Sequence, residues 1–256
     1  MDFRYYLKSD IGTTHKQNQD GAFAGIAKTA EGKVFFGVVC DGMGGMADGD
    51  FASGYVIDAV RDWFERRLPE LAEAKVLETS LYSELSGVIS GCNSVLYERG
   101  VQQGAAMGTT MSLLIITSEK YFAVQLGDSR VYRCSGGFLS QVTKDHSYVM
   151  DMVDKGLMTH SEAISSKNRN ILTRCIGCKA QVEADFYTGE VMEGDLFLIS
   201  SDGFHGGSDP EAVDTLLGGA AGIKESNMKK CILSAIDQRK ASGEKDNITA
   251  LAVLTV

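Results

Sequence analysis

Short connections between apolar strands are the feature of this sequence that most restricts its fold. Two pairs of apolar runs are joined in this way: 110–117 with 120–126 through Ser118-Glu119, and 131–134 with 138–143 through Ser135-Gly136-Gly137. Antiparallel hairpins can use connections this short, whereas parallel strands need a crossover of a dozen or more residues. The sheets are therefore predicted to be mostly antiparallel.

Several of the predicted strands, including 34–40 and 195–200, are apolar on both faces, so both faces of each sheet must be covered. Three helical stretches can supply the cover: residues 51–68, about 78–99 and about 221–240. In the first, Val56, Val60, Trp63 and Phe64 form an apolar helical stripe that is expected to lie in the core. This pattern predicts an α+β fold, a four-layer α-β-β-α sandwich of two mostly antiparallel sheets flanked by helices.

The length and composition indicate one domain. The chain has 256 residues, of which 44% are hydrophobic and only 2 are proline, and this suits a single large core over residues 1–256. Residues 147–170 are polar, rich in serine and interrupted by Gly156. We expect this segment to be a partly helical flap beside the functional site.

The charge of the chain restricts its partners. A net charge of −9 and a pI near 5.0 argue against nucleic acid or an anionic membrane as a partner, and part of the negative charge could await a metal. The longest apolar runs fall short of the roughly 18–20 residues that span a bilayer. Residues 1–6 lack the pattern of a signal peptide. A cytoplasmic protein is expected.

The six cysteines are scattered, several of them inside apolar segments: Cys40, Cys92, Cys134, Cys175, Cys178 and Cys231. They are expected to be small buried hydrophobic residues rather than a disulfide framework. Cys175-Ile-Gly-Cys178 has the spacing of a redox or zinc motif, but no second Cys or His pair lies nearby in the sequence. A structural role is therefore preferred for this pair.

Five aspartates, each in a short turn that contains Gly, Ser or Asn, are spread along the chain: Asp20, Asp41, Asp128, Asp202 and Asp246. Several of them follow apolar, β-branched runs, so the strand ends of a folded sheet would gather them. Gathered carboxylates repel one another and raise each other's pKa unless a cation neutralises them. The pattern predicts a multinuclear site for hard divalent ions.

Three of these aspartates mark strand ends. Asp41 follows the strand at 34–40, where the next residue, Gly42, could offer its carbonyl to an ion; Asp202 follows the strand at 195–200, and Asp246 precedes the last apolar run. An oxygen-rich site without His or Cys ligands favours Mg²⁺ or Mn²⁺. Two such ions about 3.5–4 Å apart would hold a bridging water and aim it in line at phosphorus. This chemistry is typical of phosphate-ester hydrolysis.

The order and the residues of the motifs resemble those of one family, the metal-dependent protein phosphatases of type 2C in their compact bacterial form. The resemblance runs nearly end to end. It rests on nine strings: Ser9-Asp10-Ile11-Gly12 with Asn18-Gln19-Asp20, Asp41-Gly42-Met43-Gly44-Gly45, Gly49-Asp50-Phe51-Ala52-Ser53, Met107-Gly108-Thr109-Thr110, Gly127-Asp128-Ser129-Arg130, Asp145-His146-Ser147, Leu172-Thr173-Arg174, Ser201-Asp202-Gly203 and Asp246-Asn247-Ile248-Thr249.

The resemblance implies two core Mn²⁺ or Mg²⁺ ions and hydrolysis of phosphoserine and phosphothreonine in proteins. By position, Asp41 would bridge the two ions, the Gly42 carbonyl would bind one of them, and Asp202 and Asp246 would complete the catalytic set. The expected partners are phosphorylated proteins, among them the substrates of a bacterial serine/threonine kinase that a monomeric phosphatase would oppose.

Two further aspartates have more peripheral roles in the family pattern. Asp20 would bind an ion or hydrogen-bond to a group that does, and Asp128 matches a position that helps to hold a weaker third ion near the flap.

His15 is the main departure from the family pattern, which usually has Arg at this position to bind the substrate phosphate. A neutral imidazole offers one donor where guanidinium offers a charged fork, so phosphate binding should weaken or become pH-dependent. His15 could contact phosphate, be a surface bystander, or act as general acid to the leaving group. Lys16 or a nearby Arg could take over the phosphate contact.

Other departures are smaller: Gln19 stands where Glu is common, Met46 where bacterial members often have His, and Asp50 where Glu is common. Gln19 can still hydrogen-bond a metal-bound water. Among the remaining histidines, His146 is expected to be structural, His160 solvated in the flap, and His205 on a loop surface.

Two alternatives to a protein phosphatase stay open. Replacement of the family Arg by His15, together with Gln19, could mark a pseudophosphatase that binds phosphoproteins without turnover. A phosphatase of small phosphorylated metabolites would use the same apparatus.

Overall fold

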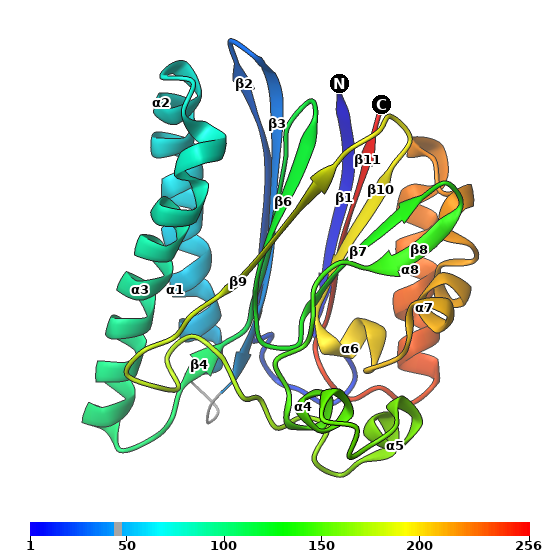
Figure 1. The fold of residues 1–256 in the computed structure, drawn as a ribbon. Coiled ribbons are helices and arrows are strands. Elements are labelled where there is room, and N and C mark those ends of the chain that lie inside the picture. Colours follow the sequence, from blue (N-terminus) through cyan, green and yellow to red (C-terminus); the bar gives the residue numbers. More distant parts are fainter. Residues whose placement is uncertain (44–47) are drawn as a thin grey trace.

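Two antiparallel sheets lie face to face in the computed structural model, which describes residues 1–43 and 48–256 (Figure 1). Helices cover the outer face of each sheet, and both chain termini lie at the same end of the sandwich. The sequence hypotheses about Gly44, Gly45 and Met46 fall outside the described residues.

The first sheet has five strands in the order β1-β11-β10-β7-β8. Their bounds are β1 Phe3–Asp10, β11 Ile248–Thr255, β10 Leu196–Ser200, β7 Arg130–Ser135 and β8 Phe138–Gln141. The first and last strands of the chain pair in register from Phe3 opposite Thr255 to Asp10 opposite Ile248. This pairing places the two ends of the sequence side by side at one edge of the sheet.

The second sheet has six strands, five of them in the order β2-β3-β5-β6-β9. Their bounds are β2 Asp20–Thr29, β3 Gly32–Met43, β5 Met111–Ile116, β6 Lys120–Leu126 and β9 Asp185–Glu190, and the short β4, Gly108–Thr109, pairs with the end of β3. Among the described residues every strand pairing within the two sheets is antiparallel, as the short connections predicted.

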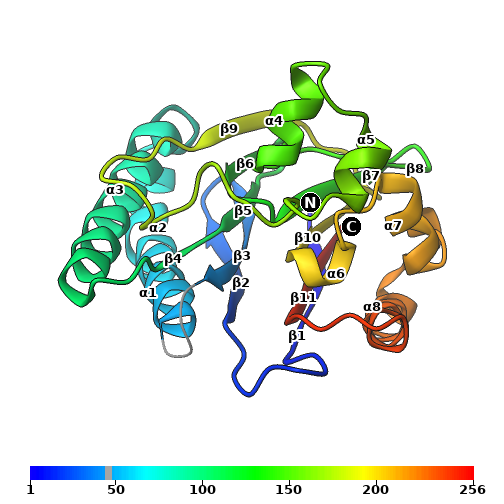
Figure 2. The same cartoon turned by 90° about the horizontal axis from the view of Figure 1, so that it is seen from below.

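The helices occupy three places around the sheets (Figures 1 and 2). The bounds of the α-helices are α1 Gly49–Asp62, α2 Leu68–Glu73, α3 Leu77–Gln103, α4 Tyr148–Asp154, α5 His160–Ser165, α6 Asp202–His205, α7 Pro210–Leu217 and α8 Glu225–Ala241. Helices α1 to α3 cover the second sheet and α7 and α8 cover the first, whereas α4, α5 and α6 lie at the end away from the termini.

Three apolar clusters hold these layers together. One joins α1, α2 and α3 to the second sheet around Phe36 and Trp63, and another joins the first sheet to α7 and α8 around Phe204 and Ile232. The third lies between the sheets and includes Phe35, Phe197 and Leu251. Burial on both faces of each sheet explains the continuous apolar runs, and the predicted four-layer architecture is confirmed.

Some elements differ from the sequence predictions. The helix expected at 51–68 is divided into α1, a π-helical turn at Trp63–Arg67, and α2, where Pro69 lies in the first turn and donates no backbone hydrogen bond. Strands β1, β2 and β9 were not predicted. β2 includes Gly21 and Gly25, which pack closely against α1 and Phe64, so its strand propensity is low.

The expectation that no cysteine forms a disulfide is wrong for one pair. Cys175 and Cys178 are bonded to each other, whereas Cys40, Cys92, Cys134 and Cys231 are free. The tight turn around Gly177 brings the two side chains together, which the spacing alone could not establish.

The segment at 147–170 contains α4 and α5, joined by a turn at Gly156. It lies at the end of the sandwich away from the termini, beside α6 (Figure 2). Across residues 1–43 and 48–256, no helix combines the length and apolarity needed to cross a bilayer.

Gly37 tests the packing between the sheets. A Cβ at this position would lie 2.7 Å from Leu251 Cδ2 and 3.0 Å from the Phe35 ring. We expect Gly37→Ala to lower the free energy of unfolding by about 1–3 kcal/mol, measured by urea denaturation. Gly87→Ala, on the exposed side of α3 with no atom near its added Cβ, should instead stabilise by about 0.5–1 kcal/mol. Equal effects of the two substitutions would contradict this account of the core.

Candidate active site

Asp20 and Asp41 are brought together by the β2–β3 hairpin, where the two residues are directly opposite each other in register. The next residue, Gly42, lies where the backbone passes close to other backbone: an added Cβ would be 2.0 Å from the Gly49 carbonyl oxygen and 2.7 Å from that of Gln19. Only glycine fits this position. The Asp-Gly string at the end of β3 is therefore required by packing as well as by any ligand role of its carbonyl.

Asp202 and Asp246 come from the first sheet. Asp202 follows β10 at the start of α6, and Asp246 precedes β11, the strand that pairs with β10. An added Cβ on Gly203 would lie 2.1 Å from the Asn247 carbonyl oxygen and 3.5 Å from Asp246 Cβ. The two turns are thus in direct contact at the end of the sandwich away from the termini.

Hydroxyl groups of the first sheet hold the Asp20 carboxylate. Ser201 Oγ and Thr249 Oγ1 donate to Asp20 Oδ2 at 2.8 and 2.6 Å. The other oxygen, Asp20 Oδ1, and Asp202 Oδ1 are buried without a hydrogen-bond partner. Because buried carboxylate oxygens are costly when unpaired, these two atoms point to a missing cationic ligand.

The proximity of the carboxylates changes their acidity. Burial raises the pKa of Asp20 to about 7, an effect opposed by its hydroxyl hydrogen bonds and increased by the charges of Asp202 and Asp246. Burial also raises the pKa of Asp202 to about 6, with the charge of Asp246 as the next cause. The pKa of Asp41 lies well above its usual range because of burial and then because of Asp20 and Asp202. The four side chains form one electrostatic cluster.

Asp128 joins this cluster from the turn between β6 and β7. Burial raises its pKa well above the usual range, and the charge of Asp202 is the next cause. Thr110 connects this turn to Asp41, because its hydroxyl accepts from the Asp41 amide at 2.8 Å and shares a 2.7 Å hydrogen bond with Ser129 Oγ. The structure therefore brings together all five aspartates that the sequence predicted.

Two buried histidines support the Asp128 turn. His205 Nε2 donates to the Asp128 carbonyl at 3.1 Å, and burial lowers the pKa of His205 well below its usual range. The expectation of a loop-surface His205 is therefore wrong: it ends the short helix α6 and packs inward. His146 has the structural role that was predicted, since its Nδ1 accepts from the Gly127 amide at 3.3 Å.

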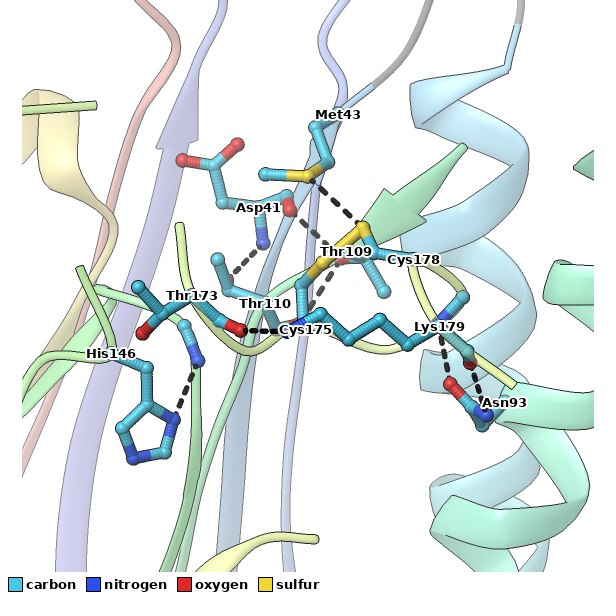
Figure 3. Close-up of a disulfide and its surroundings, with 12 residues drawn as sticks. Asp41, Met43, Asn93, Thr109, Thr110, His146, Thr173, Cys175, Cys178 and Lys179 are labelled. Atoms are coloured by element: carbon cyan, nitrogen blue, oxygen red, sulfur yellow. Dashed lines mark hydrogen bonds between the residues drawn. A yellow bond between two sulfur atoms is a disulfide. The ribbon is translucent and has the colours of Figure 1, made fainter. Parts of the chain in front are cut away.

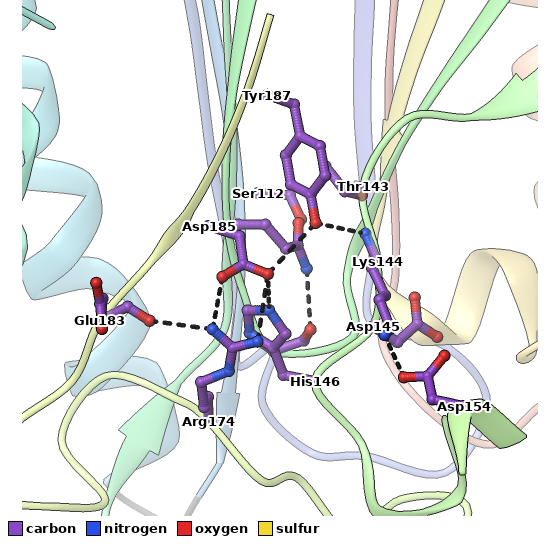
Figure 4. A network of polar contacts seen from close by, with 12 residues as sticks. Ser112, Thr143, Lys144, Asp145, His146, Asp154, Arg174, Glu183, Asp185 and Tyr187 are labelled. Carbon is purple, nitrogen blue, oxygen red and sulfur yellow. Dashed lines mark hydrogen bonds and ion pairs between the residues drawn. The ribbon is translucent and has the colours of Figure 1, made fainter. Parts of the chain in front are cut away.

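A polar network connects His146 to Asp185 and Arg174 (Figure 4). His146 Nε2 lies 3.1 Å from Asp185 Oδ2, and Arg174 binds both oxygens of Asp185 at 2.6 and 3.2 Å. Since Nδ1 accepts a hydrogen bond from the Gly127 amide, Nε2 carries the ring proton and donates to Asp185. The network fixes the orientation of His146 and thereby the Gly127-Asp128 turn.

A cleft of about 800 Å³ lies between the cluster and α5. Its walls include Asp128, Asp202 and Asp246, together with His160 and Arg169 from the 147–170 segment. His160 is exposed, as predicted. The size of the cleft would admit a side chain or short peptide segment next to the carboxylates.

The donor set fits hard divalent cations. It consists of carboxylate oxygens and backbone carbonyls, two of its oxygens are buried and unpaired, and its carboxylates raise one another's pKa. Among residues 1–43 and 48–256, no group of three or more Asp, Glu, His or Cys side chains has an arrangement that could hold a metal ion by itself. Mg²⁺ and related ions keep several waters and use only one or two carboxylates each, so the open arrangement suits them.

His15 lies at the edge of the cluster. Its Nε2 is 3.5 Å from Asp246 Oδ1, and both side chains are 42% exposed. This position next to a cleft carboxylate would allow a phosphate contact or proton transfer, although His15 is also an exposed side chain.

Several supporting residues were present in the sequence strings without an assigned role. Asn247 Oδ1 accepts from the Gln19 amide at 2.8 Å, and Asn18 Nδ2 donates to Ser9 Oγ at 2.7 Å, which in turn is 2.8 Å from Thr249 Oγ1. These bonds join the segment before β2 to β1 and β11. Their only signal in the sequence was a polar residue next to each aspartate.

The raised pKa of Asp20 predicts a pH-dependent stability. Between about pH 4 and pH 7 the folded state retains a proton that the unfolded chain has lost, so the metal-free protein loses stability as the pH rises through this window. In EDTA, Asp20→Asn should become more stable relative to wild type by about 1–2 kcal/mol between pH 5 and pH 8, measured by urea denaturation. Asp58→Asn, on the exposed side of α1, should show no such trend. If the difference in free energy of unfolding between Asp20→Asn and wild type stays the same across this pH range, the pKa of Asp20 is not raised in the folded protein.

Comparison with known proteins agrees with this geometry. A family model described as protein phosphatase 2C matches residues 11–220. A protein phosphatase 2C-type protein of Streptococcus pyogenes is 30% identical over 249 residues, which cover 96% of this chain and 95% of that protein.

Solved structures give the same result. The serine/threonine phosphatase PstP/Ppp of Mycobacterium tuberculosis superimposes with a TM-score of 0.81 at 28% identity, covering 99% of this chain and 98% of that one. A structure of the PstP catalytic domain in complex with 2 manganese ions has a TM-score of 0.77 at 27% identity, covering 98% and 97%. The chain therefore belongs to the protein phosphatase 2C family and is a serine/threonine protein phosphatase of the bacterial type.

Proposed function

We propose that this protein hydrolyses phosphoserine and phosphothreonine in phosphorylated proteins, as a monomer that opposes a bacterial serine/threonine kinase. The observation that carries the proposal is the cluster of Asp20, Asp41, Asp202 and Asp246 with two buried, unpaired carboxylate oxygens. The likeness to a phosphatase domain solved with 2 manganese ions supports it.

Two Mn²⁺ or Mg²⁺ ions would be held by Asp41, Asp202, Asp246 and the Gly42 carbonyl. When bound, the ions would activate a water for attack on phosphorus and offset the charge of the phosphate oxygens. Asp128 would help to hold a third ion at the flap side of the cleft.

The protein residues would orient this centre. Asp20 is fixed through Ser201 and Thr249, so its free oxygen Oδ1 is directed at the cluster rather than at solvent. Thr110 fixes the Asp41 backbone, and Gly42 allows the strand end to pack closely. Such preorganisation keeps the carboxylates in place when the charge on the phosphate develops.

The cleft supplies the substrate side of the proposal. Its carboxylate wall would bind the ions, whereas the 147–170 segment would form a flap over the substrate chain within a single domain of residues 1–256. His15, at the cleft edge beside Asp246, would contact the substrate phosphate.

Substitution of Asp41 tests the site. We expect Asp41→Asn to reduce kcat on a phosphothreonine peptide by at least about 100-fold in Mn²⁺, because one shared carboxylate charge is lost. The midpoint temperature of its thermal unfolding in EDTA should equal or exceed that of wild type, since removing a buried like charge relieves repulsion. Near-normal turnover, or wild-type turnover that persists in EDTA, would contradict the assignment.

Substitution of His15 tests the phosphate contact. We expect His15→Arg to lower KM for the phosphopeptide by about 3- to 10-fold, because guanidinium forms a charged, bidentate contact with phosphate. His15→Ala should raise KM, whereas Asp58→Ala, on the exposed side of α1 and outside the cleft lining, serves as the control. If His15→Arg and His15→Ala both leave KM unchanged, His15 lies outside the phosphate site. Tight phosphopeptide binding without turnover in wild type would instead indicate a pseudophosphatase.

A further inference from the structure

The disulfide between Cys175 and Cys178 lies close to the catalytic end of β3 (Figure 3). Cys175 is 5% exposed, whereas Cys178 is half-buried, and both line a separate cavity of about 360 Å³ with Met43, Arg174 and Lys179. A reagent that enters this cavity would reach the Cys178 sulfur more readily than that of Cys175.

The loop that carries the disulfide is attached to β4. Ile176, between the two cysteines, exchanges two 3.0 Å backbone hydrogen bonds with Thr109. Asn93 on α3 holds the same loop, since its Oδ1 accepts from the Gly177 amide at 2.8 Å and its Nδ2 donates to the Lys179 carbonyl at 3.0 Å. The loop is therefore clamped between α3 and β4.

β4 in turn holds the backbone of Asp41. The Thr109 hydroxyl and the Thr110 amide both donate to the Asp41 carbonyl at 2.9 Å. Together with the Asp41 amide bond to Thr110, these contacts fix both backbone polar groups of the central aspartate. Ile176, Thr109 and Asp41 thus form one continuous chain of hydrogen bonds from the disulfide loop to the cluster.

The disulfide also packs directly on this path. An added Cβ at Gly108 would lie 2.7 Å from Cys178 Sγ, and Gly108 pairs with Met43 at the end of β3. Met43 Sδ is 3.7 Å from Cys178 Sγ. A bonded sulfur carries no proton, so this last approach is a van der Waals contact, and separating the two cysteine sulfurs would change it.

We propose that Cys175–Cys178 is a thiol–disulfide exchange site for a dithiol reductant, and that its redox state controls how firmly β4 holds Asp41. The oxidised pair holds the loop against Gly108 and Met43, whereas the reduced pair loosens it. The consequence for turnover rests on the proposed phosphatase function, but the exchange reaction and the loosening of β4 do not.

The exchange step is balanced by the reductant. One thiolate of the dithiol attacks Cys178 Sγ, forming a mixed disulfide and breaking the bond to Cys175, which leaves as a thiolate. The second thiolate of the reductant then attacks the reductant's other sulfur, which is bonded to Cys178 in the mixed disulfide, and Cys178 leaves as a thiolate. The reductant becomes a disulfide, the protein pair gains two electrons, and the two protons of the dithiol are available to the protein thiolates.

The first experiment measures the bond without using activity. The full chain is treated with glutathione disulfide or dithiothreitol and alkylated with iodoacetamide, and peptides are identified by mass spectrometry. We expect Cys175 and Cys178 to be protected after glutathione disulfide and both alkylated after dithiothreitol. Free thiols at both positions after oxidation would overturn the proposal.

The second experiment measures the coupling. In EDTA, amide hydrogen exchange over residues 108–111 should be about tenfold faster in the reduced protein. After the EDTA has been removed, Mn²⁺ binding to the reduced protein, measured by calorimetry, should be about tenfold weaker than to the oxidised protein. The Cys175→Ser/Cys178→Ser double variant should resemble the reduced form and not respond to dithiothreitol, whereas Cys231→Ser on α8 should respond like wild type.

Two results would overturn the coupling: exchange rates over 108–111 that are equal in both redox states, or a dithiothreitol response that persists in the double variant. Absent turnover in both states, with the exchange response intact, would contradict the phosphatase proposal and support the redox proposal.

Discussion

Repulsion among the clustered aspartates is the constraint on which the rest of this structure depends. Four carboxylates from two different sheets meet at one end of the sandwich, and the raised pKa values of Asp20, Asp41 and Asp202 show that the metal-free fold accommodates them at a cost. The apolar layers between and outside the sheets offset that cost. Stability and divalent-ion binding are thereby linked, because a ligand that neutralises the cluster also stabilises the fold.

The support for the cluster comes from backbone pairing and hydroxyl groups rather than from cationic side chains. Asp20 is held by Ser201 and Thr249, whereas Asp41 is held by Thr109 and Thr110. A neighbouring Arg or Lys would pair with the carboxylates and lower their pKa, competing with a metal ion. Arg130, two residues after Asp128, is paired with Asp145 at 2.7 Å, and its charge lowers the pKa of Asp128 against the larger opposing effect of burial. No cationic side chain is thus among the causes that set the pKa of Asp20 or Asp41.

Much of this molecule was predictable from local patterns. The short hairpin connections predicted antiparallel sheets, the runs that were apolar on both faces predicted covering layers, and the five Asp-containing turns predicted which carboxylates would meet. The unpredicted elements β1, β2 and β9 have weaker local signals. β2 includes glycines that are explained by their close packing against α1 and Phe64. Pairing with β3, rather than the strand propensity of its own residues, determines the structure of β2.

The sequence by itself determined the architecture and the identity of the candidate ligands, because hydrophobic periodicity and turn chemistry are local properties of the chain. Only the tertiary structure decided that His205 is buried against Asp128, that His15 lies beside Asp246, and that Cys175 bonds to Cys178 on the path to Asp41. The disulfide joins residues only three apart and depends on the local turn, whereas the positions of His205 and His15 depend on contacts between residues far apart in sequence. Such contacts follow from sheet register and helix packing, which no spacing of residues along one chain specifies.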